Sequence, residues 1–437
     1  MARPRDRSPR RELYRPAQPR RARIGLWLGA MAMALFIVAG RLPLVVETVY
    51  SEGIYRYIVW PLAAFSSLFD SSLSEIIFGL VGLALLIAPF AGWRHVRRRG
   101  FSRLRASVGA LVRLTSTAGY AWFVFLIVWG INYQRPHPVA LFHLGPMPSP
   151  EKVAVLSEKI GRRADLLRQG LSEDERGVVC LSQPLNALDE QLTTLQLRAL
   201  RRAGLKGMAA GRAKAFRSSP LLLRIGVSGT YGLFCGEPNV VLPAAPGLLP
   251  FTLAHERAHL SGLAWEEAAS YAGLLTLWES QDPVLRYSGW LKLWLTLRPT
   301  TQGRAAGVQR DLRAIRAFYR EHVGAAAPAV QAAYGGFLRA HGVQGGLRSY
   351  GRFADLVLRR IARDGFPPLP PGVDSAEPTS VPPSDAAETL PGTTSLRPDE
   401  PGASPSESTA GAAPHALVTP AQPALSEPSG GIQQENR

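Results

Sequence analysis

Two histidines four residues apart, His255 and His259, with Glu256 directly after the first, have the residue types and spacing of a metal site. In a helix the two imidazoles lie one turn apart on the same face, so both can reach one ion. Glu256 then lies beside the pair, where it can take a proton from a water whose pKa a zinc ion has lowered. The pattern predicts zinc-dependent hydrolysis. Its alternative is two ordinary helix histidines next to a solvated carboxylate.

A zinc site with two histidines also needs a third protein ligand and an open position for water. Gly262 lies three residues after His259, where it can end the helix, and Glu266 and Glu267 begin a second apolar helix shortly afterwards. Such a turn can bring a carboxylate back beside the histidines. Because adjacent residues point about 100° apart on a helix, only one of the two glutamates can face the metal. The alternative for both is the ordinary stabilisation of acids at a helix N-terminus.

The surrounding segments suggest further parts of a hydrolytic site. Residues 237–243 are bounded by prolines and are expected to form a short strand. This strand either holds an extended substrate by backbone hydrogen bonds or serves as an ordinary core strand. Tyr231, Tyr271 and Tyr350 could each donate a hydrogen bond to an oxyanion, and core packing is the alternative for each.

Three uncharged apolar runs precede the metal motif, at residues 24–40, 76–93 and 114–130, and each contains 17 or 18 residues. This length reaches the lower limit for crossing a hydrocarbon core of about 30 Å. Buried core helices are the alternative, but three such runs within the first 130 residues favour three transmembrane helices. The lipid bilayer is therefore the first expected partner.

Basic residues are concentrated beside these runs. Of the formal net charge of +17, residues 1–23 carry +7 and residues 94–105 carry +6, whereas residues 41–75 hold two arginines and four acids. Because Lys and Arg are enriched on cytoplasmic flanks, the N-terminus is predicted to be cytoplasmic and everything after Gly130 to be outside. That location argues against nucleic acid as a partner, although residues 131–365 carry a further +12.

Composition divides the chain into a basic head at residues 1–23, a membrane region at 24–130, an extracytoplasmic domain at 131–365 and a tail at 366–437. The tail is rich in Pro and Ser and is expected to be disordered. Helical periodicity dominates the domain. Its expected helices are 151–167, 185–203, 251–260, 266–279, 284–297, 310–323 and 347–362.

The order of these motifs resembles the gluzincin class of zinc peptidases, in which one helix carries His-Glu-x-x-His and the next carries Glu-x-x-Ala. More closely, the chain is similar to an uncharacterised bacterial family of membrane-anchored proteins, with a few N-terminal spans followed by such a domain. The similarity covers most of residues 40–360. The matching stretches are 46–51, 130–133, 249–271, 286–289 and 349–350.

This resemblance implies a mainly α fold with a small β element, in which three N-terminal transmembrane helices precede a gluzincin-like metallohydrolase domain. It also implies Zn2+ as the cofactor, with His255, His259 and Glu266 as its ligands and Glu256 as the general base.

Within the resemblance, Glu266 is preferred to Glu267 as the ligand because Ala269 follows Glu266 by three residues, as the family pattern requires. The sequence departs from that pattern further on. Ala268 and Ser270 stand where the family has Glu and Asn, so a side chain that orients a ligand is expected to be missing.

The predicted function is that of a membrane-anchored zinc-dependent hydrolase, a peptidase that acts on a peptide or cell-envelope substrate. The alternative is a catalytically inactive, membrane-anchored binding module whose basic domain holds anionic cell-wall or lipid surfaces. Cys180 and Cys235 could form one disulfide in an oxidising compartment.

Overall fold

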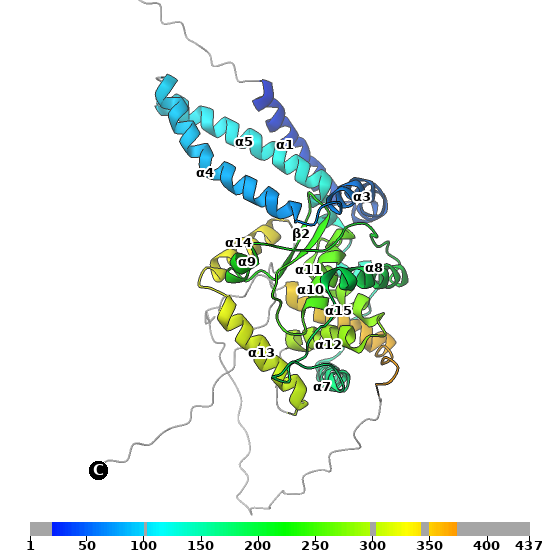
Figure 1. The fold of residues 1–437 in the computed structure, drawn as a ribbon. Helices are drawn as coiled ribbons and strands as arrows, with labels where there is room; N and C mark the ends of the chain where they lie inside the picture. The colour runs from blue at the N-terminus through cyan, green and yellow to red at the C-terminus, as the bar shows by residue number, and fades with distance from the viewer. Residues whose placement is uncertain (1–19, 100–102, 298–302, 342–348, 374–437) are drawn as a thin grey trace, which may run out of the picture.

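The computed structural model describes residues 20–99, 103–297, 303–341 and 349–373. Within these residues the chain is mainly helical, with one three-stranded sheet. The N-terminal elements are α1 (Arg20–Ala39), α2 (Pro43–Val45), the π-helical η1 (Val46–Ile54), α3 (Tyr55–Ser66), α4 (Leu73–Arg99) and α5 (Arg103–Val128). The long helices α1, α4 and α5 extend together from one end of a globular part (Figure 1).

The globular part contains the sheet and the remaining helices. Its elements are the 3-10 helix η2 (Gly130–Gln134), α6 (Pro138–Leu141), α7 (Pro150–Arg168), α8 (Leu185–Arg202), β1 (Lys214–Ala215), α9 (Ser219–Arg224), β2 (Gly229–Gly232), β3 (Glu237–Val240), α10 (Leu249–Leu260), α11 (Glu266–Trp278), α12 (Pro283–Leu297), α13 (Ala306–His322), α14 (Ala327–Ala340) and α15 (Ser349–Asp364). The seven helices predicted for this domain are present with small shifts at their ends, whereas α14 and the short helices α6 and α9 were not predicted.

The three predicted membrane spans coincide with helices, but the helices do not qualify equally as spans. Ser107–Val128 of α5 is long and apolar enough to cross a bilayer. Arg23–Ala39 qualifies only together with Pro43–Ser66, from which it is bent by 103°, and the apolar part of α4, Leu73–Ala88, is shorter. The described residues therefore support one candidate span, or two if the bent pair forms one, and not the predicted three.

Helix α1 packs closely along α5 through small residues. A Cβ on Gly119 of α5 would collide with the carbonyl oxygen of Gly25, and Gly29, one turn further along α1, faces the same glycine. Small residues four apart let two helix backbones approach in this way. Many of the other side chains on α5 are apolar and exposed, and Leu114 has 69% of its surface exposed.

After α1 the chain turns and continues as one helical stretch, Pro43–Ser66. Arg135, which follows η2, ties this stretch to the globular part. Its guanidinium donates hydrogen bonds of 2.6 and 2.7 Å to the two carboxylate oxygens of Glu47 and one of 2.9 Å to the carbonyl oxygen of Gly262, just after α10.

Helices α10, α11 and α12 form the centre of the globular part. Ten of the 12 residues of α10 and 11 of the 13 residues of α11 are buried. A helix that is buried on all sides needs no single apolar stripe. Gly273 lets α11 approach α10, because a Cβ at this position would lie 3.1 Å from the backbone nitrogen of His255.

The sheet has the order β1-β3-β2, with β3 parallel to β1 and antiparallel to β2. The strand predicted at residues 237–243 is present as β3 and is the central strand. Because both of its edges are paired, β3 cannot hold an extended substrate. Among the described residues, β2 is an edge strand that retains this capacity.

Residues 366–373, which were assigned to the disordered tail, instead pack against the domain. The ring of Phe366 stacks on Trp290 of α12 with centroids 5.8 Å apart, and Arg163 donates a 2.6 Å hydrogen bond to the carbonyl oxygen of Pro367. The packed chain therefore continues beyond the predicted boundary, because an aromatic ring stands among the prolines. The rest of the tail and most of the basic head lie outside the described residues.

The two cysteines do not form the disulfide that the sequence left open. Both are free thiols, with Cys180 partly exposed ahead of α8 and Cys235 buried between β2 and β3.

Candidate metal centre

Helix α10 presents His255 and His259 on one face, one turn apart, and α11 brings Glu266 against them. Nε2 of His255 lies 3.1 Å from Oε2 of Glu266 and 3.1 Å from Nε2 of His259. Nε2 of His259 lies 3.4 Å from the same carboxylate oxygen. The turn between the helices contains Gly262 with a φ of +83°, as expected for a residue that ends a helix.

The separations within this group fit one zinc ion. In a tetrahedral site with bonds of about 2.0–2.1 Å, two ligand atoms lie about 3.3 Å apart. The three donor atoms form a triangle with edges of 3.1, 3.1 and 3.4 Å. Two imidazoles and one carboxylate are also a donor set typical of catalytic zinc, in which water takes the fourth position.

Both imidazoles are held in orientation through their other nitrogen. Nδ1 of His259 donates a 2.7 Å hydrogen bond to the carbonyl oxygen of Leu263, and Nδ1 of His255 lies 3.1 Å from Oγ of Ser270. Because a carbonyl oxygen only accepts, a neutral His259 keeps the lone pair on Nε2, facing the other donors. The expectation that an orienting side chain is missing is therefore wrong, since Ser270 takes this position.

The two adjacent glutamates have different partners. Glu266 faces the histidines and accepts a 2.6 Å hydrogen bond from the Tyr334 hydroxyl on α14 through its second oxygen, Oε1. Glu267 points away and forms a 3.3 Å ion pair with Arg352 of α15. The geometry therefore assigns the third donor to Glu266.

Glu256 lies beside the donor group rather than in it. Glu256 lines a cavity that also contains the three donor residues, and a Cβ on Gly229 of β2 would lie 2.7 Å from Oε1 of Glu256. Burial raises the pKa of Glu256 to about 8, although the charge of His259 opposes this shift. A carboxylate with a raised pKa is well suited to accept and release a proton near neutral pH.

The field inside the donor group favours positive charge. Burial lowers the pKa of His259, but the Glu266 carboxylate outweighs burial and raises that pKa to about 9. Burial raises the pKa of Glu266, but the two imidazoles outweigh it and hold the pKa well below its usual range. An ionised carboxylate beside two imidazoles is the electrostatic setting that a divalent cation requires, and metal binding displaces the competing proton.

A cavity of about 410 Å³ opens over the donor group. Its other walls include side chains from elements that lie far apart in the sequence. They contribute Phe78 of α4, Phe125 and Trp129 at the end of α5, Tyr231 of β2 and Tyr334 of α14.

Of the three tyrosines proposed as oxyanion donors, Tyr231 lines the cavity. Tyr271 packs in the core, with its ring centroid 4.8 Å from that of Phe142, and the side chain of Tyr350 lies outside the described residues. Tyr334 was not considered from the sequence, although it touches a ligand candidate. An apolar helix with a single tyrosine carries no local signal of such a contact.

Fold and site together define a mainly helical protein with a buried His-His-Glu group at the base of its long apolar helices. The chain belongs to the family described as "Protein of unknown function (DUF3810)", whose model matches residues 50–358, well over half of the chain. The match includes α10, α11 and the cavity walls. It does not bear on the resemblance to gluzincins, which stays a prediction. Searches of curated proteins and of solved structures gave no match.

Proposed function

We propose that this chain is a membrane-anchored zinc-dependent peptidase of the gluzincin type. The observation that carries the proposal is the triangle of donor atoms from His255, His259 and Glu266, whose edges of 3.1, 3.1 and 3.4 Å match a tetrahedral zinc site. The oriented imidazoles and the adjacent Glu256 support it, because catalytic zinc sites combine ordered ligands with a nearby proton acceptor.

His255, His259 and Glu266 would hold the metal through Nε2, Nε2 and Oε2. When bound, zinc supplies Lewis acidity that lowers the pKa of a coordinated water toward about 7. Glu256 accepts a proton from the attacking water and later donates it to the leaving amine. Water is the one co-reactant: its oxygen bonds to the carbonyl carbon, the C–N bond breaks, and a carboxylate and an amine are released.

Peptide is the favoured substrate class because an edge strand borders the cavity. An extended chain can add to β2 through backbone hydrogen bonds, and Gly229 keeps this strand close to Glu256. Tyr231 lines the same cavity and can donate a hydrogen bond to the oxygen that gains negative charge.

Membrane anchoring is supported by α5, which is apolar and largely exposed, and by its close contact with α1. In the proposed arrangement α1, α4 and α5 all cross the bilayer, with flanking residues extending the shorter apolar segments. The basic stretches 1–23 and 94–105 lie in the cytoplasm and the metal centre outside it, following the distribution of Lys and Arg.

Zinc analysis of the purified full chain tests the proposal first, and one equivalent of bound zinc is expected. Glu256→Gln keeps the shape of the side chain but removes the base, so it should retain zinc and lower peptide cleavage by about 10²- to 10⁴-fold. His255→Ala should lose both zinc and cleavage. Turnover by Glu256→Gln at the wild-type rate would refute the mechanism even with zinc bound.

A C-terminal fusion tests the orientation. A reporter that is active only in the cytoplasm should stay silent when fused after the last residue of the chain. Strong reporter activity would contradict the extracytoplasmic location and leave the zinc site unaffected.

A further inference from the structure

The cavity over the metal centre is walled in part by the helices that lead away from the globular part. Phe78 lies in the second turn of α4, Phe125 lies in the last turn of α5, and Trp129 directly follows α5. At a rise of about 1.5 Å per residue, Phe78 lies about 8 Å from the start of α4 and Phe125 about 5 Å from the end of α5. This wall is therefore built from the helix ends nearest the globular part.

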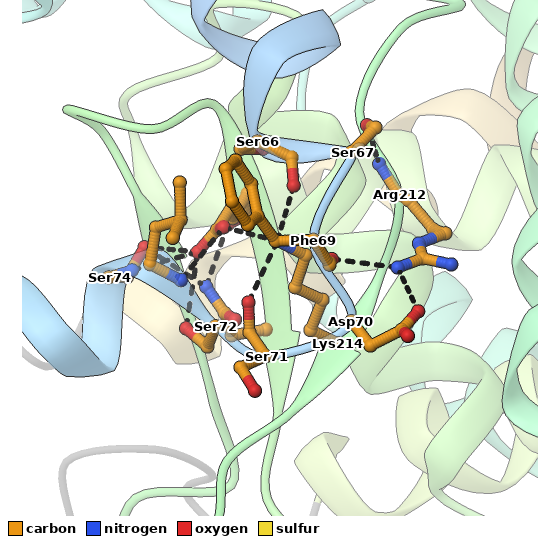
Figure 2. A network of polar contacts seen from close by, with 12 residues as sticks. Ser66, Ser67, Phe69, Asp70, Ser71, Ser72, Ser74, Arg212 and Lys214 are labelled. Carbon is orange, nitrogen blue, oxygen red and sulfur yellow. Dashed lines mark hydrogen bonds and ion pairs between the residues drawn. The ribbon is translucent and has the colours of Figure 1, made fainter.

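A buried ionic cluster fixes the start of α4. Figure 2 shows residues 66–74, from the end of α3 to the start of α4, lying against Lys214 of β1. Glu237 of the central strand accepts hydrogen bonds of 3.0 and 2.9 Å from the backbone nitrogens of Leu73 and Ser74, and one of 2.6 Å from Lys214 Nζ. A carboxylate is favoured at the first N–H groups of a helix. Helix α4 therefore begins at a defined place beside the metal centre.

The end of α5 is fixed in the same region. The Tyr50 hydroxyl of η1 donates a 2.9 Å hydrogen bond to the carbonyl oxygen of Ile127. The Trp129 ring lies 6.0 Å from the ring of His259 and 5.0 Å from that of Tyr231, measured between centroids. The candidate span thus ends in contact with a metal-ligand candidate.

The stretch Pro43–Ser66 indicates where a bilayer surface would lie. It runs at 103° to the helix before it, and it exposes aromatic side chains, with Tyr57 at 84% and Trp60 at 58% exposure. Exposed tyrosine and tryptophan on an apolar helix are typical of the membrane–water interface. With α1 across the bilayer, this stretch lies along the bilayer surface, at the level where α5 ends and α4 begins.

We infer that the substrate is a polypeptide anchored in the same membrane and cleaved within a few residues of the bilayer surface. This inference rests on the proposed peptidase function and adds its substrate class. The backbone of the substrate lies along the edge of β2, and an apolar side chain beside the cleaved bond lies against Phe78 and Phe125. One product stays in the bilayer and the other is released from it.

The test uses the full chain reconstituted in phosphatidylcholine vesicles. Mixed-sequence peptides carry a palmitoyl anchor through a short spacer of about three Gly and Ser residues or a long spacer of about twenty, and a third pool has no anchor. Because an extended residue spans at most about 3.6 Å, the short spacer keeps the first bond within about 11 Å of the bilayer. The short-spacer pool should be cleaved at least about tenfold faster than the unanchored pool and no slower than the long-spacer pool.

Each other outcome has a defined meaning. The inference would be overturned if the long-spacer and unanchored pools were cleaved but the short-spacer pool was not. Equal cleavage rates in all three pools would also overturn it. Either result would leave the proposed peptidase function intact. If no pool is cleaved by protein that holds one equivalent of zinc, the proposed peptidase function and the inference fall together.

A second measurement needs no turnover. In zinc-loaded Glu256→Gln protein, a benzophenone in the short-spacer peptide should crosslink to the segments of α4 and α5 that carry Phe78 and Phe125. Crosslinks confined to other segments would contradict the inference.

Two variants of α4 complete the test. Phe78→Ala, which removes part of the cavity wall, should slow cleavage of the short-spacer pool about tenfold. Leu86→Ala is the matched control, because Leu86 is an apolar residue of the same helix with 78% exposure that lies outside the cavity. Equal losses in the two variants would contradict the inference, because they would show a general effect on the helix.

Discussion

Two helix pairs in this molecule approach each other through glycine, yet their surroundings are opposite. Helices α10 and α11 meet at Gly273 and carry four ionisable groups of the candidate metal centre, and nearly all of their residues are buried by protein. Helices α1 and α5 meet at Gly119, and many of their apolar side chains are exposed. Close approach of two helices at a glycine thus occurs both in the protein interior and between helices that are proposed to lie in lipid.

The difference shows where polar groups can be tolerated. Burying an unpaired polar group is costly, so each donor candidate in the α10–α11 pair has a hydrogen-bond partner. The α1–α5 contact instead uses small uncharged residues, as expected for the proposed location in lipid, which offers polar groups no partner. Substitutions of the donor candidates or of their hydrogen-bond partners in the first pair should therefore change metal affinity, and substitutions in the second pair should change helix association alone.

The largest effect is expected at the third ligand candidate. Glu266→Ala should lower zinc affinity by more than about 100-fold, because even a residue that only orients a ligand contributes about 10- to 100-fold. Glu267→Ala is the matched control on the same turn and should keep the affinity, since this side chain pairs with Arg352. Competition with a chelator measures both. Zinc lost with Glu267→Ala and kept with Glu266→Ala would reverse the assignment and leave the two-histidine site intact.

The next largest effect concerns the hydroxyl that orients His255. Ser270→Ala should lower zinc affinity about 10- to 100-fold, because the imidazole loses its partner at Nδ1. Thr276→Ala is the control: it removes a buried hydroxyl from the same helix, but that hydroxyl bonds only to the Ala272 carbonyl oxygen. The same chelator competition applies, and wild-type affinity in Ser270→Ala would show that the contact does not orient the ligand.

The metal centre illustrates how far sequence reasoning reaches. The neighbourhood of His255 and His259 follows from a spacing of four on a helix, and a nearby carboxylate follows from the short turn after them. The choice of Glu266 over Glu267 came from the family resemblance. Ser270 was misread, because a family pattern was compared position by position, whereas any hydroxyl at the right height on α11 can reach Nδ1. Tyr334 could not be predicted, because it is 68 residues from its partner Glu266 and only the tertiary fold joins them.

In the fold, too, features with a local sequence signal were predicted and features that depend on the tertiary structure were not. Long periodic helices of the domain were predicted, because their signal is local. Strand β2 was not, because its sequence Gly229–Gly232 is short and rich in glycine, which strands disfavour. Of the three predicted spans, the described residues support only α5 by itself, because an uncharged run predicts an apolar helix but not where that helix bends, as the chain does between α1 and α3.

A smaller effect is expected from crowding the α1–α5 contact. Gly119→Val should destabilise helix association by about 1–3 kcal/mol, because a side chain must enter a close contact. Gly109→Val is the control on the same helix, since a Cβ there meets no atom within 4 Å. Unfolding in bilayer-mimetic particles measures the loss, with zinc content followed in the same samples. Loss of zinc in step with the separation of α1 and α5 would show that the two helix pairs are coupled.

The smallest effect is expected on the exposed face of α5. Leu114 has 69% of its surface exposed, so Leu114→Ala should change the free energy of unfolding by less than about 0.5 kcal/mol. Leu277 of α11 is fully buried, and Leu277→Ala should cost about 2–5 kcal/mol because it leaves a cavity in a close-packed core. The same unfolding measurement compares the two. Lipid can fill the space of a removed side chain, whereas a close-packed protein core cannot. A loss of unfolding free energy in Leu114→Ala as large as in Leu277→Ala would therefore mean that protein covers this face of α5. The contrast between the two helix pairs would then be wrong.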